Sequence, residues 1–403
     1  MFSAKEIKRC FLTSLWFVFL TFPLLVIKVD PLERIVHWRW ENMLYVAVGS
    51  FFLSYLFRLM LSKKEGGTTA TTAAIENIRA PLITRILENP KHRNFLAAAV
   101  LAAAVVFPFL VSTYQTNVMT TALMYVVLGL GLNIVVGLAG LLDLGFVAFY
   151  AVGAYSYALL HYHFEISFWA ALPIGGALAA FFGILLGYPV LRLRGDYLAI
   201  VTLGFGEIIR LILENWSDFS QGPSGISNIP RPGFFGIELS LNDAMVYIYY
   251  LMIIAVIITI FVVNRLQDSR LGRAWIALRE DEIACQAMGV DKRKTKLVAF
   301  SLGAFWAGLM GVVFAAKTTF INPASFTFLE SAIILSIVVL GGMGSIVGVI
   351  VGALILILMP EYLRALSEYR MLAFGAVLVM MMVFRPQGMI GVIRKTYKFN
   401  KGE

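Results

Sequence analysis

One charged stretch stands between long apolar runs of the sequence. Residues 279–290 read REDEIACQAMGV and begin with four consecutive ionisable side chains, Arg279, Glu280, Asp281 and Glu282. Read as a single helix, the stretch is amphipathic, with an apolar face formed by Ile283, Ala284, Ala287 and Met288. Gly289 is placed to end it, because glycine tolerates the left-handed conformation found at helix ends. From the spacing alone, an ordinary solvated cytoplasmic turn is the favoured interpretation, and contact with another protein is the alternative.

A few polar groups interrupt the apolar segments themselves. Charges inside such segments are functional candidates because burying them in lipid is costly. Glu207 and Arg210 are spaced i, i+3 on one predicted helix, where they would form either a structural ion pair or a gate. Asp143, Asn133 and Thr202 are further candidates for lining a polar route across the membrane.

The sequence offers no set of residues for bond-making chemistry. His161 and His163 alternate near Glu165, but a metal site needs further ligands, so we expect an exposed turn there. No catalytic triad and no GxxxxGK[ST] phosphate loop occurs, so the chain is not expected to hydrolyse ATP itself. We therefore expect no catalytic residue, no metal and no cofactor bound by this chain.

The composition is that of a protein with many membrane-spanning helices. Of 403 residues, 60% are hydrophobic and only 14% are charged. A crossing takes roughly 20 apolar residues, which leaves room for about ten to twelve crossings. A β-barrel is excluded because the apolar runs are continuous rather than alternating. The net charge of +9 then indicates basic cytoplasmic loops, with lipid rather than nucleic acid as the surroundings.

The order of apolar and polar segments predicts three parts. Residues 1–94 contain two spans, 10–27 and 43–61, followed by a polar cytoplasmic hinge. Residues 95–390 form the core, with predicted spans at 95–113, 116–137, 141–160, 167–190, 197–213, 244–263, 297–316, 330–359 and 369–384 and a cytoplasmic loop at 264–296. Residues 391–403 form a basic tail, and the positive-inside rule puts both termini in the cytoplasm.

One predicted span is too long for a single straight crossing. The segment 330–359 contains GGMGS at 341–345, which is a place for the helix to break. Such a break would let helix N-termini near Gly341, Gly342 and Gly344 receive a carboxylate. Small residues also recur at four-residue spacing, as in Gly303, Ala307 and Gly311, and predict close helix packing.

Several motifs together resemble a known family of transporters. EIACQAMG resembles the cytoplasmic loop with which permeases of ATP-binding-cassette (ABC) importers dock their ATPase. GLLDLGFVAFYAVGAY (140–155), GDYLAIVTLGFGEIIR (195–210), GPSGIS (222–227), LGGMGS (340–345) and FRPQG (384–388) follow in the order of the longer, LivM-type permease subunit of branched-chain amino acid importers. The resemblance covers residues 114–391.

The resemblance implies an ABC importer permease fold in a bacterial inner membrane. It implies a heterodimer with a second, related permease, two cytoplasmic subunits that bind and hydrolyse ATP, and a periplasmic binding protein for leucine, isoleucine and valine. By analogy, the loop around Glu282 transmits nucleotide-driven movement to the helices.

Other functions stay open on the sequence alone. Relatives with the same motifs import urea or short amides. An ion-coupled secondary transporter would use Glu207 or Asp143 as its coupling site, but has no need of an ATPase-docking helix. A membrane enzyme acting on lipid would show clustered catalytic residues at a membrane face, and none is evident.

Overall fold

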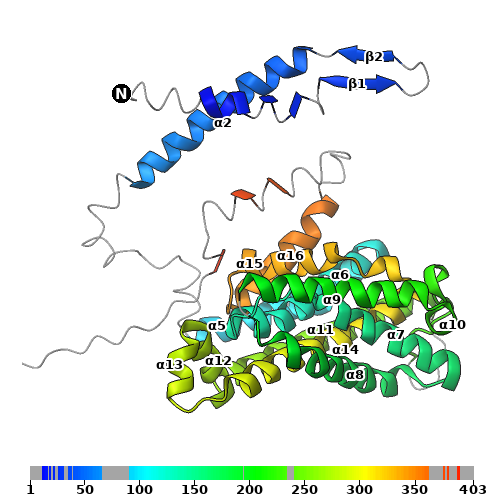
Figure 1. Cartoon of the computed structure of the whole chain (residues 1–403). Helices are drawn as coiled ribbons and strands as arrows, with labels where there is room; N and C mark the ends of the chain where they lie inside the picture. The colour runs from blue at the N-terminus through cyan, green and yellow to red at the C-terminus, as the bar shows by residue number, and fades with distance from the viewer. Residues whose placement is uncertain are drawn as a thin grey trace, which may run out of the picture. The chain divides into compact units, whose positions relative to one another are not determined.

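The computed structural model describes residues 90–193, 195–233, 240–362 and 388–390, short helical pieces at 375–376 and 379–380, and parts of 11–65 (Figure 1). The chain divides into two compact units, Met1–Ala98 and Ala99–Glu403. The predicted basic tail, most of the predicted hinge and most of the last predicted span lie outside the described residues.

The first unit holds one long helix and a short hairpin. Helix α2 (Trp40–Glu65) contains the predicted span 43–61. Strands β1 (Ile27–Asp30) and β2 (Ile35–Trp38) pair antiparallel, with Ile27 opposite Trp38. The hairpin lies in the connection between the first two predicted spans. Both strands are rich in β-branched residues, which favour an extended backbone.

The second unit is a helical bundle, seen in the lower part of Figure 1. Its first half contains α5 (Pro90–Leu110) from Ala99 onward, α6 (Thr113–Leu132), the π-helical segment η2 (Asn133–Leu138), α7 (Phe146–Phe164), α8 (Phe168–Val190) and α9 (Asp196–Asn215). Its second half contains α10 (Ser217–Ser220), η3 (Gly222–Ser224), α11 (Leu241–Gln267), α12 (Arg270–Glu280), α13 (Glu282–Ala287), α14 (Lys292–Thr318), η4 (Pro323–Ser325), α15 (Phe328–Gly341) and α16 (Ile346–Tyr362).

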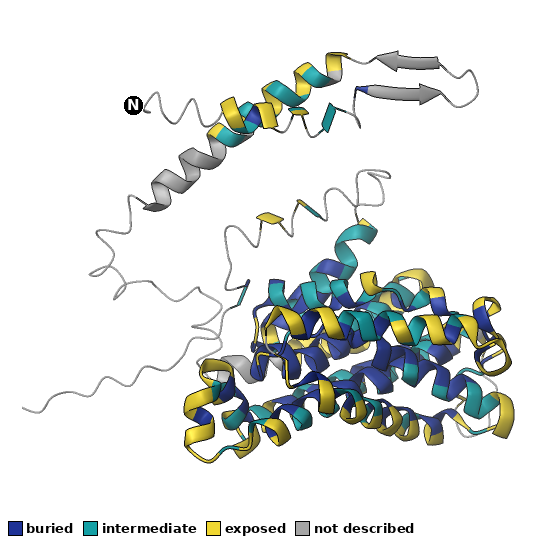
Figure 2. Ribbon diagram, in the orientation of Figure 1, coloured by how far each residue is buried: buried dark blue, intermediate teal, exposed yellow. Residues whose placement is uncertain are grey.

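The helices confirm a polytopic membrane protein. Among the described residues, five helices are long and apolar enough to cross a bilayer: Thr113–Leu138, Phe168–Val190, Asn242–Gln267, Lys292–Thr318 and Pro323–Gly341. Three shorter apolar helices, Met43–Phe52, Ala98–Leu110 and Ile346–Tyr362, add to them. Figure 2 shows exposed residues along the outer helices of the bundle, and large apolar side chains such as Phe181, Ile200 and Phe261 are among the exposed residues, as expected where lipid or another subunit covers them.

The long predicted span 330–359 is broken, as its length and glycines predicted. Helix α15 ends at Gly341 and α16 begins at Ile346. Between them Gly342 and Gly344 have φ of 113° and 86°, a region that side-chain-bearing residues avoid. The two helices then fold back on each other, because a β-carbon added at Gly348 would lie 2.1 Å from the carbonyl oxygen of Gly341.

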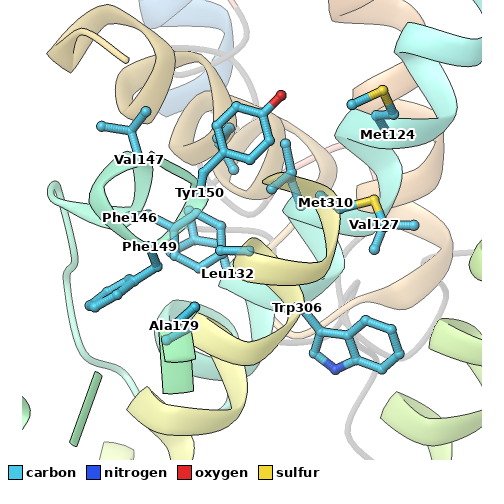
Figure 3. Packing of buried hydrophobic residues seen from close by; sticks show 14 of the residues in the cluster. Met124, Val127, Leu132, Phe146, Val147, Phe149, Tyr150, Ala179, Trp306 and Met310 are labelled. Carbon is cyan, nitrogen blue, oxygen red and sulfur yellow. The ribbon is translucent and has the colours of Figure 1, made fainter. Parts of the chain in front are cut away.

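Helix α14 lies at the centre of the bundle and packs against α6, α7 and α8. Large side chains such as Phe146, Trp306 and Met310 fill the space between these helices (Figure 3). Elsewhere the backbones nearly touch: a β-carbon on Gly153 would lie 2.1 Å from the carbonyl oxygen of Gly308. The predicted small-residue stripe on α14 is thus a packing surface, since Gly311 approaches the backbone of Tyr150 in the same way.

This packing yields a first prediction, on stability. Gly308→Ala places its new β-carbon 2.4 Å from the Ala179 β-carbon and 2.6 Å from the Gly175 carbonyl oxygen. Overpacking of this kind costs about 1–3 kcal/mol, so the variant should unfold at lower temperature in detergent. Gly204→Ala in α9 is the matched control because nothing lies within 4 Å of its added β-carbon. A variant Gly308→Ala as stable as the control would contradict the close packing.

Candidate functional site

The charged stretch 279–290 is two helical pieces and not the single helix expected. Arg279 and Glu280 close α12, and the backbone of Asp281 is extended, with φ −154° and ψ 109°. Asp281 is the N-cap of α13, where its Oδ1 accepts hydrogen bonds from the N–H groups of Ile283 at 2.8 Å and Ala284 at 3.1 Å. A capping aspartate satisfies N–H groups that a helix start leaves free, so it begins a new helix rather than continuing the old one.

The end of α13 is where the sequence predicted it. Gly289 has φ of 86°, and no atom lies within 4 Å of a β-carbon added there. Its N–H donates to the carbonyl of Gln286 at 3.0 Å, and the N–H of Val290 donates to that of Cys285 at 3.2 Å. This pair of bonds is the Schellman arrangement of a helix C-terminus. Helix α13 is therefore short, capped at both ends and fixed in length.

The predicted apolar face of α13 is exposed to solvent. The side chains of Ile283 and Met288 are 72% and 84% exposed, and Ala284 and Ala287 are exposed beside them. Cys285 alone among the residues of α13 is buried. Exposed large apolar side chains gathered on a polar loop indicate a surface that another protein covers.

Buried groups hold this segment to the bundle. The indole of Trp275 is fully buried and donates to the carbonyl of Thr295 at 2.8 Å. Lys296, only 4% exposed, pairs with Glu282. Asp291 caps α14, and hydrogen bonds from the backbone N–H groups of Lys294 and Arg293 lower its pKa. The segment is thus a rigid attachment at the start of α14.

Arg279 points away from the exposed face. Its guanidinium donates to the carbonyl of Gly137, in η2, and pairs with Glu280 at 3.5 Å. The aliphatic part of the Arg279 side chain packs against Gly140. A β-carbon at position 140 would lie 2.4 Å from Cγ of Arg279, so this contact requires glycine. Arg279 therefore joins the segment to the middle of the bundle.

Asn133 and the helix break meet at the same place. The Oδ1 atom of Asn133 accepts a hydrogen bond from the N–H of Gly344 at 2.8 Å, and both groups are buried. Gly137 permits the approach, because a β-carbon there would lie 1.9 Å from that Oδ1 and 2.5 Å from the nitrogen of Gly344. The structure thus brings together Arg279, Asn133 and Gly344, which are far apart in sequence.

The segment 388–390 completes the break. The N–H of Met389 donates to the carbonyl of Leu340 at 2.8 Å, and that of Ile390 donates to Gly341 at 3.1 Å. Gly388 lies against Gly342, where any β-carbon would be 2.4 Å from its Cα. Ser345 caps α16 by accepting from the N–H of Gly348 at 3.1 Å. The N–H groups of Gly344 and Gly348 are therefore engaged within the protein.

Asp143 and Thr202 lie together in a second buried place. They line a cavity of about 10 Å³, close to the room that one water needs, with Phe149, Phe205 and Phe300 among its walls. Asp143 Oδ1 accepts from the N–H of Gly145 at 2.9 Å, whereas its Oδ2 has no partner among the described residues. Thr202 accepts from the N–H of Leu144 at 3.0 Å. The cavity is too small for an amino acid.

Glu207 and Arg210 form the predicted ion pair on α9. The Arg210 guanidinium is 2.8 Å from Glu207 and 2.8 Å from Glu214, one turn further along. All three side chains are partly exposed, so the cluster lies on the surface of the bundle, apart from the break and from Asp143. Among the described residues, no group of three metal-ligating side chains occurs.

The sequence analysis missed two charges near the other end of the bundle. Lys317, in the last turn of α14, donates to the carbonyl of Asn117 at 3.3 Å and to the hydroxyl of Thr121. Glu330, in the first turn of α15, accepts from the hydroxyl of Tyr125. Each lies at the edge of an apolar run, where charged residues commonly flank a membrane span. The sequence signal that could have identified them was a charged side chain close enough to a span to reach into it.

A broken helix inside an apolar bundle, joined to a capped and exposed helix at one end, defines a polytopic membrane permease. A family model described as branched-chain amino acid transport system / permease component matches residues 114–384. The chain belongs to this family.

Individual relatives agree with the family. The high-affinity branched-chain amino acid transport system permease protein LivM of Escherichia coli K12 is 42% identical over 91% of this chain and 88% of its own length. The permease protein LivH of the same transport system in Salmonella typhimurium LT2 is 24% identical over 68% of this chain and 94% of its length. The ribose import permease protein RbsC of Escherichia coli K12 is 28% identical over 69% of this chain and 84% of its own length. No solved structure matches the chain.

The Glu282–Lys296 pair gives the second prediction. Glu282→Gln leaves the charge of Lys296 without its partner in a buried place, which should lower the free energy of unfolding by about 2 kcal/mol, less than for a fully buried pair. The double variant Glu282→Gln/Lys296→Met should regain most of that loss, because no unpaired charge remains. Thermal denaturation in detergent measures both.

The matched control is Lys294→Met, which breaks the exposed pair of Lys294 with Asp291. Such surface pairs contribute about 0–1 kcal/mol. If Glu282→Gln behaves like this control, the buried pair does not hold α13 to α14.

Proposed function

We propose that this chain is a membrane-spanning permease subunit of an ATP-driven importer for leucine, isoleucine and valine in a bacterial inner membrane. The 42% identity to LivM supports this substrate class. The observation that carries the ATP-driven part is α13, a short helix capped at both ends whose exposed apolar face is fixed to the bundle from behind. ATP is bound and hydrolysed by separate partner subunits, and this chain binds no cofactor.

In this proposal α13 docks into a cleft of an ATPase subunit. Ile283 and Met288 enter the cleft, since exposed apolar side chains are stabilised by being covered. Movement of the ATPase then reaches the bundle along two connections, Glu282 to Lys296 at the start of α14 and Arg279 to Gly137 in η2. The second connection leads directly to the break held by Asn133 and Gly344.

The remaining partners follow from the same system. LivM and LivH are different permease proteins of one named transport system, which supports a second, related permease beside this chain. A pair of ATPases and a periplasmic binding protein complete the importer. The basic residues around 264–296 support a cytoplasmic position for α13, and in this proposal both termini lie on the same side.

Other transport functions are weaker proposals. Similarity to a ribose permease extends to 28% identity, so family membership alone leaves the substrate open, and urea or amide import stays the alternative substrate class. An ion-coupled carrier would need an accessible titratable site, but the cavity beside Asp143 admits about one water and Glu207 is already paired with Arg210. A carrier of that kind also has no use for α13.

The third prediction concerns docking. The double variant Ile283→Asp/Met288→Asp puts two charges on the apolar face, and ATPase subunits should no longer co-purify in mild detergent. Residues central to an interface contribute about 2 kcal/mol or more each, so leucine uptake should fall by more than about 10-fold. Gln286→Asp is the matched control, because Gln286 is exposed on the same helix but outside that face. Full co-purification with the double variant would refute docking through α13.

The fourth prediction separates docking from transmission. Arg279→Met removes the hydrogen bond to Gly137 and leaves the exposed face of α13 unchanged. We expect the ATPases to stay bound and to hydrolyse ATP, while leucine transported per ATP falls several-fold in proteoliposomes. Arg270→Met, at an exposed position on α12, is the control. An unchanged transport-to-hydrolysis ratio would show that Arg279 does not transmit the movement.

A further inference from the structure

Two opposite charges contact the same helix near one end of the bundle. The Lys317 ammonium donates to Asn117 and Thr121, and the Glu330 carboxylate accepts from Tyr125. Asn117, Thr121 and Tyr125 follow each other at four-residue spacing on α6, so they form one row along that helix. Thr121 and Tyr125, which contact Lys317 and Glu330 respectively, are therefore about one helical turn apart, or ~6 Å along the helix axis.

Neither charge has an ionic partner within the part of the chain that the structure describes. The ion pairs found there within 4 Å involve Arg210, Arg279, Lys294 and Lys296, and neither Lys317 nor Glu330. Charges placed between membrane helices are normally paired, because their desolvation is costly. Hydroxyl and carbonyl groups orient these two charges but do not neutralise them.

The two charges reach a surface and not the sealed core. Lys317, Glu330, Thr121 and Tyr125 are all partly exposed. The site lies away from α13, because α14 rises about 40 Å between its start beside α13 and its last turn at Lys317. With α13 in the cytoplasm, as in the proposed function, this end faces the side of the membrane from which the substrate is supplied.

An aromatic cluster lies beside the charges. The rings of Tyr150, Phe314 and Phe326 are in mutual contact, with centroids 5.3 to 5.8 Å apart. The N–H of Val147, three residues before Tyr150, donates to the hydroxyl of Ser331, the residue after Glu330, at 2.9 Å. Phe314 is partly exposed, so the cluster offers an apolar surface at the same place as the two charges.

We propose that Lys317 and Glu330 form a binding site for the zwitterionic backbone of an aliphatic amino acid. Lys317 binds the α-carboxylate and Glu330 binds the α-ammonium, while the aromatic cluster contacts the side chain. Each of the two contacts is a charge-assisted hydrogen bond, which is stronger than a bond between neutral groups. The inference rests on the proposed function and names the residues that recognise its substrate on entry.

The arrangement fits a zwitterion better than other ligands. A lone anion would satisfy Lys317 and leave Glu330 unpaired, and a lone cation would do the reverse. An uncharged amide or urea would leave both charges without an ionic partner. An amino acid neutralises both at once and, being neutral overall, can leave again when the bundle rearranges.

The test measures ligand binding to the purified complete importer in lipid nanodiscs, without the soluble binding protein. The ligands are leucine, 4-methylpentanoate, which lacks the ammonium, and 3-methylbutylamine, which lacks the carboxylate. A hydrogen bond to a charged group is worth roughly a factor of 10 or more, so the wild type should bind leucine at least about 10-fold more tightly than either analogue.

Each variant should lose the preference for leucine over one of the two analogues. In Glu330→Gln, leucine should bind no more than about 3-fold better than 4-methylpentanoate, because the ammonium is no longer recognised. In Lys317→Met, leucine and 3-methylbutylamine should bind with similar affinity, because the carboxylate is no longer recognised. A merely structural role would weaken all three ligands alike. If either variant fails to assemble, Lys317→Arg and Glu330→Asp keep the charges, and they should retain the preference for leucine over both analogues.

The outcomes separate this inference from the proposed function. Glu165→Gln, in an exposed turn, is the control carboxylate and should match the wild type in binding and in leucine uptake. If wild type imports leucine but both variants keep full discrimination, the zwitterion site is wrong and the proposed function stands. If the variants instead lose the second permease subunit and still discriminate, the two charges belong to a subunit contact. If wild type does not import leucine, the proposed function fails and this inference fails with it.

Discussion

A broken helix inside a membrane protein must satisfy its free backbone groups without water, and much of this structure follows from that constraint. The break between α15 and α16 is closed from two sides. Asn133 accepts from the N–H of Gly344, and the chain at Met389 and Ile390 donates to the last carbonyls of α15. Both closures need backbone contact, which explains why glycines line the break on every side. A side chain at Gly137 would occupy the position of the Asn133 oxygen.

The same closure ties the break to the exposed helix. Segment η2 supplies Asn133 to the break at its first residue and the Gly137 carbonyl to Arg279 one turn later. Helix α6, which leads into η2, holds Lys317 and Glu330 further along the same four-residue row, through Thr121 and Tyr125. One continuous element therefore contacts Lys317 and Glu330, the break and Arg279. A displacement of Arg279 has a direct physical connection to the place where α15 and α16 fold back.

Part of this arrangement is local and was predictable from the sequence. The break followed from the length of the run 330–359 and its glycines, and the end of α13 followed from Gly289. The division of the charged stretch at Asp281 was visible in principle as a capping residue, but among four charges it was interpreted as one more polar side chain. The contacts of Arg279 with Gly137 and of Glu282 with Lys296 join separate elements, and such contacts cannot be predicted from the spacing of residues along the chain. The same holds for Lys317 and Glu330, which meet only because α14 and α15 both pack on α6.

Residues 275–288 contain two sets of side chains, one exposed to solvent and one bound to the bundle. Ile283 and Met288 are left uncovered and bring nothing to the stability of the isolated chain. Trp275, Glu282 and Arg279 do the opposite, because Trp275 and Glu282 are bound to neighbouring residues of α14 and Arg279 is bound to Gly137 in η2. A docking surface without these attachments would bind its partner and move alone, since a flexible loop absorbs displacement instead of passing it on. One attachment on α13, through Glu282, and two on the preceding helix α12, through Trp275 and Arg279, connect displacement of α13 to α14 and to η2, and η2 is the element that holds the break.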